Sequence, residues 1–136
     1  MAQIIEDYCS FETSKLLKEK GFDAPCKNYY SLYTEDVKHN LQKKYGAKKN
    51  WNSFALAISR PSQSLVMKWL REVHNLVIEP YRTACGYLYT ISSIPYGSIK
   101  HDNFDAFDGD DEDSGQWTTW EKACEDGIRY CLEKLI

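Results

Sequence analysis

The C-terminal stretch Trp117–Ile136, with the sequence WTTWEKACEDGIRYCLEKLI, decides the fold because it joins a helix start signal to a long apolar periodicity. Thr118 and Glu121 have the spacing of a capping box, a hydroxyl at the N-cap and a carboxylate three residues later. Apolar or small residues then recur at the i, i+3, i+4 spacing of one helical face: Trp120, Ala123, Cys124, Gly127, Ile128, Cys131, Leu132 and Leu135. Gly127 costs a helix about 1 kcal/mol relative to alanine, so we expect the helix backbone to approach another element closely there.

Two further segments carry helix signals. Ser10 is a suitable N-cap for a helix that ends at Gly21, where a left-handed residue is expected, with Phe22 folding back on the last turn. A second apolar stripe predicts a helix that Asn75 closes, with a buried face formed by Leu65, Val66, Trp69, Leu70 and Val73. We expect the core to include Trp69, Leu70, Trp120, Ile128 and Leu132.

Four segments have the composition of strands. Asn28–Tyr33 is rich in tyrosine, and Phe54–Ile58 alternates large apolar residues with alanines, so we expect the large residues to be buried. Leu76–Tyr81 and Gly86–Ile91 have the spacing of a hairpin. Thr34–Lys49 is polar, with a stripe that predicts a short helix through Val37, Leu41 and Tyr45.

This order of helices and strands predicts an α+β fold. The economical arrangement is an antiparallel sheet of about four strands with about three helices packed against it. A chain of 136 residues fits a single domain over 1–136 and needs neither a disulfide nor a metal to hold its core.

Composition bounds the class of protein. No apolar run is long enough to span a bilayer. The N-terminal residues 1–7 lack the basic and apolar regions of a signal peptide. The five cysteines are odd in number and form no CxxC motif, and Cys124 and Cys131 lie on the apolar face of the last helix. We therefore expect a reduced, cytoplasmic protein that is not attached to a membrane.

Charge is distributed unevenly around a net value of −3. Lys27–Lys49 holds six lysines against Glu35 and Asp36, a local balance of +4. This stretch is a candidate nucleic-acid surface, because lysines neutralise phosphates and neighbouring aromatic rings stack on bases; its candidate residues are Lys43, Lys44, Lys48 and Lys49. The simpler interpretation is a solvated loop, and the overall acidity argues against nucleic acid as a partner.

The acidic block Asp102–Asp113 holds seven carboxylates and no lysine or arginine. Part of it has the spacing of an EF-hand calcium loop, with oxygen ligands at alternate positions and a closing glutamate: Asp110, Glu112, Ser114 and Glu121. Glutamate is too long for the third position of such a loop, and no helix is expected before Asp110. Solvated carboxylates with no metal site are the alternative, and no cofactor is expected.

Candidate catalytic chemistry is limited to one cysteine. Cys85 lies outside the predicted helices, and His74 or His101 would have to serve as its base in a small thiol- or histidine-dependent hydrolase. No GxSxG, HExxH or glycine-rich phosphate loop is present. His74 also closes a helix, where a cation interacts favourably with the helix dipole. The sequence therefore favours a protein that is not an enzyme.

Three helical segments, 11–22, 67–74 and 120–132, resemble a family of small uncharacterised proteins from gut bacteria and their phages or prophages. The resemblance implies an accessory protein of a mobile element, and it carries no catalytic residues with it. Together with the missing catalytic motifs, it predicts a non-enzymatic cytoplasmic protein that binds another macromolecule. The expected partner is a protein or a second copy of the chain, and a nucleic acid is the alternative.

Overall fold

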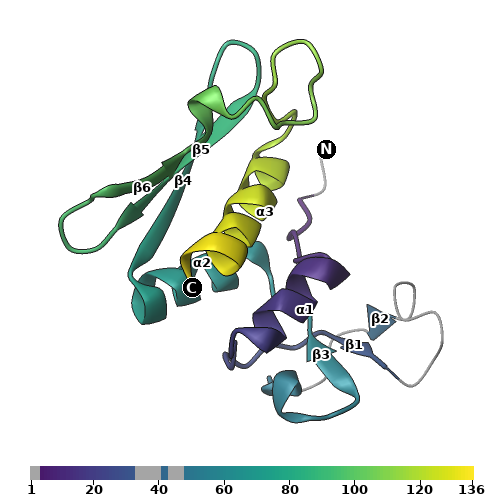
Figure 1. The fold of residues 1–136 in the computed structure, drawn as a ribbon. Coiled ribbons are helices and arrows are strands. Elements are labelled where there is room, and N and C mark those ends of the chain that lie inside the picture. The colour runs from purple at the N-terminus through teal and green to yellow at the C-terminus, as the bar shows by residue number, and fades with distance from the viewer. Residues whose placement is uncertain (1–3, 33–40, 43–47) are drawn as a thin grey trace. The chain divides into compact units, whose positions relative to one another are not determined.

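A computed structural model describes residues 4–32, 41–42 and 48–136, without the side chains of Leu41, Gln42 and Asp105 (Figure 1). The chain divides into two compact units, Met1–Leu65 and Val66–Ile136, which we call the N-terminal unit and the C-terminal unit. Helices and antiparallel strands occur in the described part of the chain, so the predicted α+β class is confirmed. The prediction of a single domain is not tested by this division.

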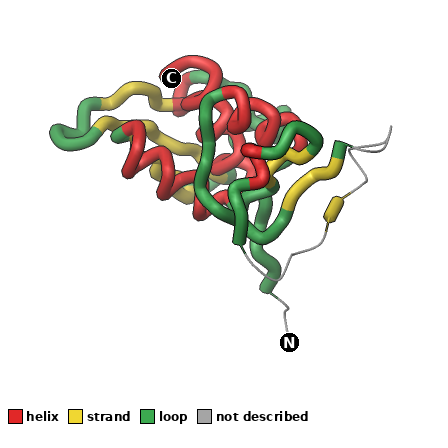
Figure 2. Tube along the Cα trace, turned by 90° about the horizontal axis from the view of Figure 1, so that it is seen from below, coloured by secondary structure: helices red, strands yellow, loops and turns green. Residues whose placement is uncertain are grey.

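The N-terminal unit combines one helix with very short strands. Helix α1 (Phe11–Glu19) is followed by β1 (Tyr29–Ser31), β2 (Leu41–Gln42) and β3 (Ala57–Ser59), with a 3-10 turn at Trp51–Ser53. The strands form an antiparallel sheet in the order β2-β1-β3. Figure 2 distinguishes these short strands, in yellow, from the loops that join them, in green. Most of the described part of this unit is therefore loop, and contacts other than a strand ladder hold it.

Helix α1 has the termini that the sequence predicts. The hydroxyl of Ser10 accepts a hydrogen bond from the backbone N–H of Thr13 at 3.2 Å, which identifies Ser10 as the N-cap. Gly21 has a positive φ of 86°, and Phe22 returns a backbone hydrogen bond to Leu17 and is fully buried. Both ends of α1 are thus set by local sequence.

The C-terminal unit is built on a longer antiparallel meander. Helix α2 (Gln63–His74), in which the boundary between the units falls, precedes β4 (Leu76–Arg82), β5 (Tyr87–Ser93) and β6 (Ile99–Asp102). The three strands pair in the order β4-β5-β6, and the first two form the predicted hairpin. Asn75, which closes α2, has the left-handed φ of 57° expected of a helix end.

Helix α3 (Trp120–Tyr130), extended by a π-helical turn at Cys131–Leu135, packs against β4 and β5 (Figure 1). The close approach predicted at Gly127 is confirmed. A Cβ atom at this position would lie 2.8 Å from Cγ2 of Ile78 and 3.3 Å from Cδ2 of Tyr89. The missing side chain therefore lets the helix backbone rest directly on the sheet.

The start of α3 differs from the prediction by one residue. The N-cap is Thr119, whose hydroxyl accepts a hydrogen bond from the N–H of Lys122 at 3.1 Å. Thr118 is bound instead to the carboxylate of Asp110, through both its N–H and its hydroxyl at 2.8 Å. The capping-box spacing predicts Thr118 as the N-cap, but its tertiary contact with Asp110 leaves Thr119 in that role.

The predicted core is correct for Trp69, Leu70, Ile128 and Leu132, which are all buried. Trp120 is 45% exposed, so its predicted burial is wrong. This residue occupies the first turn of α3, and its ring lies in a T-shaped arrangement with that of Tyr87, with 6.2 Å between centroids. Val73, on the last turn of α2, is likewise exposed. Apolar stripes are least reliable at helix ends, where the partner surface stops.

The strands are divided between two three-stranded sheets rather than joined in one sheet of about four. Phe54–Ile58 forms a strand only from Ala57 onward, and Phe54 and Leu56 lie in a turn with exposed side chains. The helix predicted within Thr34–Lys49 falls mostly outside the described residues. The two residues of this segment that are described, Leu41 and Gln42, form the strand β2. They pair with Tyr30 and Tyr29 of β1, respectively.

All five cysteines are free thiols, and Cys85 is the exposed one. The predicted burial of Cys124 and Cys131 is confirmed. Among the helices of the described residues, none has both the length and the apolar character needed to cross a bilayer.

Candidate binding site

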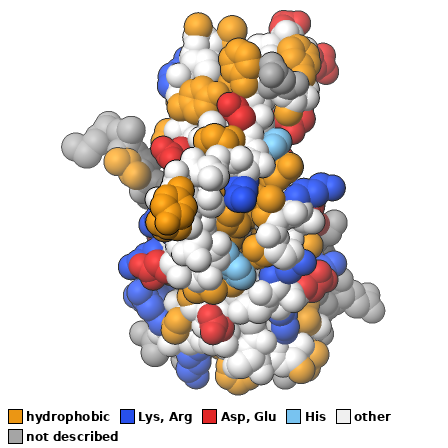
Figure 3. All heavy atoms as spheres, turned by 60° about the vertical axis from the view of Figure 1, so that its left-hand side comes forward, with side chains coloured by type: hydrophobic (Ala, Val, Ile, Leu, Met, Phe, Trp, Pro, Cys, Tyr) orange, Lys and Arg blue, Asp and Glu red, His pale blue; other side chains and the backbone are white. Residues whose placement is uncertain are grey.

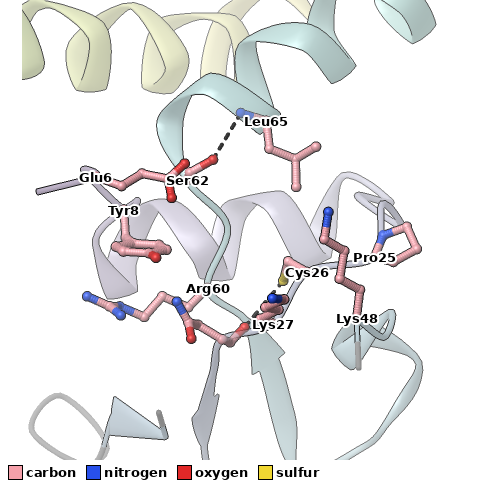
Figure 4. Close-up of a pocket in the computed structure, with 10 residues that line it drawn as sticks. Glu6, Tyr8, Pro25, Cys26, Lys27, Lys48, Arg60, Ser62 and Leu65 are labelled. Carbon is pink, nitrogen blue, oxygen red and sulfur yellow. Dashed lines mark hydrogen bonds between the residues drawn. The ribbon is translucent and has the colours of Figure 1, made fainter. Parts of the chain in front are cut away.

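Two hollows in the N-terminal unit bring together side chains that the sequence leaves apart. The first, which we call the basic cavity, has a volume of about 300 Å³. Its wall includes the charged or polar side chains of Glu6, Tyr8, Lys27, Lys48, Arg60 and Ser62. Figure 4 shows Tyr8 and Arg60 on one side of this cavity, and Pro25 and Lys48 on the other.

Backbone pairing between distant segments holds the basic cavity open. The backbone N–H of Cys9 donates to the carbonyl of Pro61 at 2.9 Å. The backbone N–H of Arg60 donates to the backbone carbonyl of Asn28 at 2.9 Å. Cys26 and Lys49 exchange two backbone hydrogen bonds of 3.0 Å. Three segments, at 6–9, 25–28 and 60–65, are thereby fixed around one hollow.

Arg60 is the best-positioned cation of the cavity. Its guanidinium lies over the ring of Tyr8 at 4.4 Å and over that of Tyr30 at 5.9 Å, so aromatic rings fix its orientation. Its Nε atom is buried and has no hydrogen-bond partner within the described structure. Arg60 therefore brings a positive charge of fixed orientation to this end of the cavity.

Lys27 and Lys48 add two positive charges to the wall, in which Glu6 is the one carboxylate within the described ranges. Cys26 is part of the wall but is not a reactive group there. Burial raises the pKa of its thiol, which donates to the carbonyl of Asn28 at 3.3 Å. The cavity is thus suited to hold an anion and has no activated nucleophile.

The second hollow, which we call the aromatic groove, has a volume of about 360 Å³. Its lining is mostly apolar: Tyr29, Ser31, Trp51, Phe54, Ala55, Leu56 and Ala57. Tyr29 and Trp51 stack with 4.1 Å between ring centroids. Phe54 is 49% exposed and Leu56 is 46% exposed, so large apolar side chains face solvent at this groove.

Side chains from other elements hold the turn that carries the groove. Lys18, on α1, donates from Nζ to the carbonyls of Phe54 at 2.9 Å and Ala57 at 2.7 Å. Asn52 donates to the carbonyl of Phe22 at 2.9 Å and accepts from the N–H of Ser59 at 2.8 Å. The exposed apolar residues are therefore presented by a braced turn.

The predicted nucleic-acid residues are only partly described. Lys43 and Lys44 lie outside the described residues. Lys48 is in the wall of the basic cavity, and Nζ of Lys49 lies 5.7 Å from the ring of Trp51. Lys27, the first residue of the predicted lysine-rich stretch, is part of the same wall, and Arg60, which lies outside that stretch, joins it.

The calcium-loop candidates do not converge on one point. Asp110 accepts hydrogen bonds from Thr118 and from Nζ of Lys122, and these contacts hold the pKa of its carboxyl at about 2. Glu112 is exposed at the loop tip, and Glu121 lies in the first turn of α3. Within the described ranges, no group of three or more His, Cys, Asp or Glu side chains is placed to hold a metal ion.

The structure does not bring Cys85 together with either candidate base. Cys85 lies in the turn between β4 and β5, whereas His74 precedes β4 at the far end of the seven-residue ladder. Each strand residue advances about 3.4 Å, so the hairpin's length separates the two side chains. His101 pairs with Ile91 midway along the sheet and stacks on Tyr130, with 3.7 Å between ring centroids.

A buried polar cluster in the C-terminal unit was not predicted. The hydroxyl of Tyr89 donates to Asp126 at 2.5 Å, and burial raises the pKa of both groups. Nearby, the ring of His101 lies 5.8 Å from that of Tyr89. The sequence pattern places Asp126 on the polar side of α3. Its hydrogen bond from Tyr89, a residue of β5, shows that it faces the sheet.

The chain matches no protein-family model, no curated protein and no solved structure. The resemblance to small proteins of gut bacteria and their phages therefore stays a prediction.

Proposed function

We propose that the protein is a non-enzymatic cytoplasmic accessory protein, of a kind carried by phages or other mobile elements, that binds another protein through the aromatic groove. One observation carries this proposal: Phe54 and Leu56 expose large apolar side chains beside the stacked rings of Tyr29 and Trp51. Apolar side chains grouped around a hollow are typical of contact surfaces rather than of solvated turns.

The bracing of the turn supports the same proposal. Two hydrogen bonds from Lys18 and two through Asn52 hold the groove in one shape. A surface that is already ordered loses less conformational entropy when a partner binds. Large hydrophobic side chains are also exposed in the C-terminal unit, among them Tyr96 and Ile99, and Figure 3 shows hydrophobic side chains reaching the surface in several places. The groove differs from these in having a concave shape.

The charges around the groove specify the partner further. Lys18 and Lys49 carry positive charge next to the lining residues, and no carboxylate belongs to the lining among the residues that the structure describes. We therefore expect the bound segment to place an apolar or aromatic side chain in the groove, with aspartate or glutamate beside it. Such complementarity mainly determines specificity and association rate.

Selection of binding peptides from a random displayed library tests this proposal on the purified full chain. The expected result is a set of peptides that share an apolar residue flanked by acidic residues. These peptides should bind at least tenfold more weakly to a Phe54→Asp, Leu56→Asp variant in a fluorescence polarisation titration. Both side chains are about half exposed, so the variant should keep its fold, which circular dichroism would verify.

The matched control is Tyr96→Asp, which places a carboxylate on an aromatic residue that is 91% exposed in the C-terminal unit. It should leave peptide binding unchanged. Selected peptides that bind the groove variant as well as the parent would assign recognition to another surface and overturn the proposal.

Nucleic-acid binding is the second candidate, favoured by the grouping of Lys48 with Lys27 and Arg60 around one cavity. Titration of labelled single-stranded and duplex DNA and RNA at two salt concentrations tests it, because each phosphate contact releases a counterion. Steep salt dependence that Lys48→Glu with Lys49→Glu removes would support this candidate. Equal, weak binding by parent and variant would exclude these lysines from such a surface.

A further inference from the structure

The basic cavity has an excess of positive charge that the described part of the chain does not neutralise. Lys27, Lys48 and Arg60 form no ion pair with a described acidic side chain, and Glu6 is the one carboxylate among the described residues of the wall. Arg60 in addition buries a donor, Nε, that has no acceptor among the described residues. Among the described residues the wall therefore carries an excess of positive charge, to which an anionic group is complementary.

The loop between β6 and α3 carries exposed carboxylates that have no cation beside them. Asp111, Glu112 and Asp113, which we call the acidic tip, form the turn of the loop between β6 and α3 (Figure 1). Glu112 and Asp113 are exposed, and the lysine that follows them, Lys122, is bound to Asp110. The tip therefore presents carboxylates to solvent without a cation beside them.

The acidic tip is a formed turn. Asp111 and Gly115 are joined by a backbone hydrogen bond of 2.7 Å, and Gly109 donates to the carbonyl of Gly115 at 2.9 Å. The carboxylate of Asp111 accepts from the N–H groups of Asp113 at 3.0 Å and Ser114 at 3.4 Å. The side chains of the next two residues, Glu112 and Asp113, are exposed at this hydrogen-bonded turn.

We propose that the basic cavity of one copy of the chain receives the acidic tip of a second copy. The described wall of the cavity supplies three cations against one carboxylate, and the tip supplies the exposed carboxylates of Glu112 and Asp113 with no cation among its residues. A cavity of about 300 Å³ has room for the few side chains at the end of a turn rather than for a broad surface.

The geometry has a consequence for assembly. The cavity and the tip are different surfaces, so the contact is head to tail. In a pair of copies, one therefore keeps an empty cavity and the other keeps an unbound tip. The contact is small and formed by charges, so association is weak, rises with protein concentration and falls with salt. This inference does not depend on the aromatic groove, which none of its residues line.

Sedimentation velocity of the full chain over a range of concentrations, at about 0.1 M and about 1 M salt, tests the proposal, because screening is far stronger at the higher salt. Two variants reverse the charges: Lys27→Glu with Lys48→Glu in the cavity, and Glu112→Lys with Asp113→Lys in the tip. We expect the parent to associate at low salt, and each variant alone to associate at least tenfold more weakly. An equimolar mixture of the two variants should associate again, since each then carries the charge complement of the other.

The matched control is Lys68→Glu with Lys100→Glu, which reverses two exposed lysines of the C-terminal unit and should behave as the parent. A parent that stays monomeric at both salt concentrations would overturn the proposal. So would a mixture of the charge-reversed variants that fails to associate. Binding of a labelled single-stranded oligonucleotide that depends on Lys27 and Lys48, by a parent that remains monomeric, would assign the cavity to nucleic acid instead.

Discussion

The two units of this chain reach a folded state by different means. In the C-terminal unit, β4 and β5 pair over seven residues and α3 packs on them through the contact at Gly127. In the N-terminal unit the strands have three, two and three residues, and side chains such as Asn52 and Lys18 bind backbone carbonyls that no strand partner reaches. One unit is ordered by a repeating ladder and the other by individual bonds.

The difference explains where the candidate binding sites lie. In the C-terminal unit α3 packs against β4 and β5, and the hollow beside this helix, lined by Trp117, Lys122 and Arg129 among others, is smaller, at about 230 Å³. A unit made of loops, fixed at a few points, keeps hollows between those points, and both the basic cavity and the aromatic groove are of this kind. Binding residues are commonly carried on loops that a scaffold positions.

The largest expected effect concerns the ladder. Ile91 is fully buried and lies opposite Ile78, so Ile91→Ala should lower the free energy of unfolding by about 2–5 kcal/mol through lost burial and a cavity. Urea unfolding followed by circular dichroism measures it. Ile99→Ala in β6 is the control, because that side chain is 61% exposed and should change stability by less than about 0.5 kcal/mol.

The next effect concerns the individual bonds. Asn52→Ala removes both the bond to the carbonyl of Phe22 and the bond from the N–H of Ser59, and should cost about 1–3 kcal/mol, the penalty for unpaired backbone groups. Ser53→Ala removes one exposed hydroxyl contact, to Asn50, and is the control. Equal stability of the two variants would show that this bracing is not what holds the N-terminal unit.

A smaller effect on stability distinguishes a glycine needed for close packing, Gly127, from one needed for its backbone conformation, Gly21. Gly127→Ala should destabilise by about 1 kcal/mol, because crowding against Ile78 outweighs the better helix propensity of alanine. Gly21→Ala meets no atom within 4 Å, so its cost is backbone strain at a φ of 86°, and Gly21→Asn should cost less because asparagine tolerates this conformation. Thermal melts of the three variants test this. A stabilising Gly127→Ala would contradict the close packing of α3 on the sheet.

The smallest effect is a pH dependence with two opposite signs in the C-terminal unit. Burial raises the pKa of Asp126 above 3.8, so its contribution is present below that value and is lost as pH rises through the folded-state pKa. The bonds from Lys122 and Thr118 lower the pKa of Asp110 to about 2, so its contribution is present above 3.8 and is lost as pH falls through about 2. Melting temperatures measured across this range test both contributions. Asp126→Asn should reduce the fall in melting temperature as pH rises, and Asp110→Asn should reduce the fall as pH drops toward 2. Identical pH profiles for parent and variants would refute both assignments.

The predictability of the fold follows the same division between units. Helix caps and periodic stripes are local, so the sequence predicts α1, α2, α3 and the β4–β5 hairpin. The exposure of Trp120 and the cap at Thr119 depend on Tyr87 and Asp110, which are distant in sequence, so local patterns misplace them. Strand β6 escaped prediction because its four residues alternate between apolar and polar only weakly.

The candidate sites were less predictable than the fold. Alternation at Phe54–Ile58 indicates a buried strand, yet Lys18 and Asn52 hold the first part of it as an exposed turn. Lys27 and Lys48 are far apart in sequence from Arg60, and only the pairing of Cys26 with Lys49 and of Asn28 with Arg60 brings them to one cavity. A sequence shows the charge of such residues, and the backbone bonds that group them appear only in the structure.

Trp51 provides an optical probe that is already part of the molecule. The other three tryptophans, Trp69, Trp117 and Trp120, fall after residue 65. The indole N–H of Trp51 donates to the carbonyl of Cys26 at 2.8 Å, in the cavity wall, while its ring stacks on Tyr29 in the groove. A protein in which the other three are phenylalanine would emit tryptophan fluorescence from this single position, between the two hollows, and a shift in its emission would report occupancy of either one without an added dye.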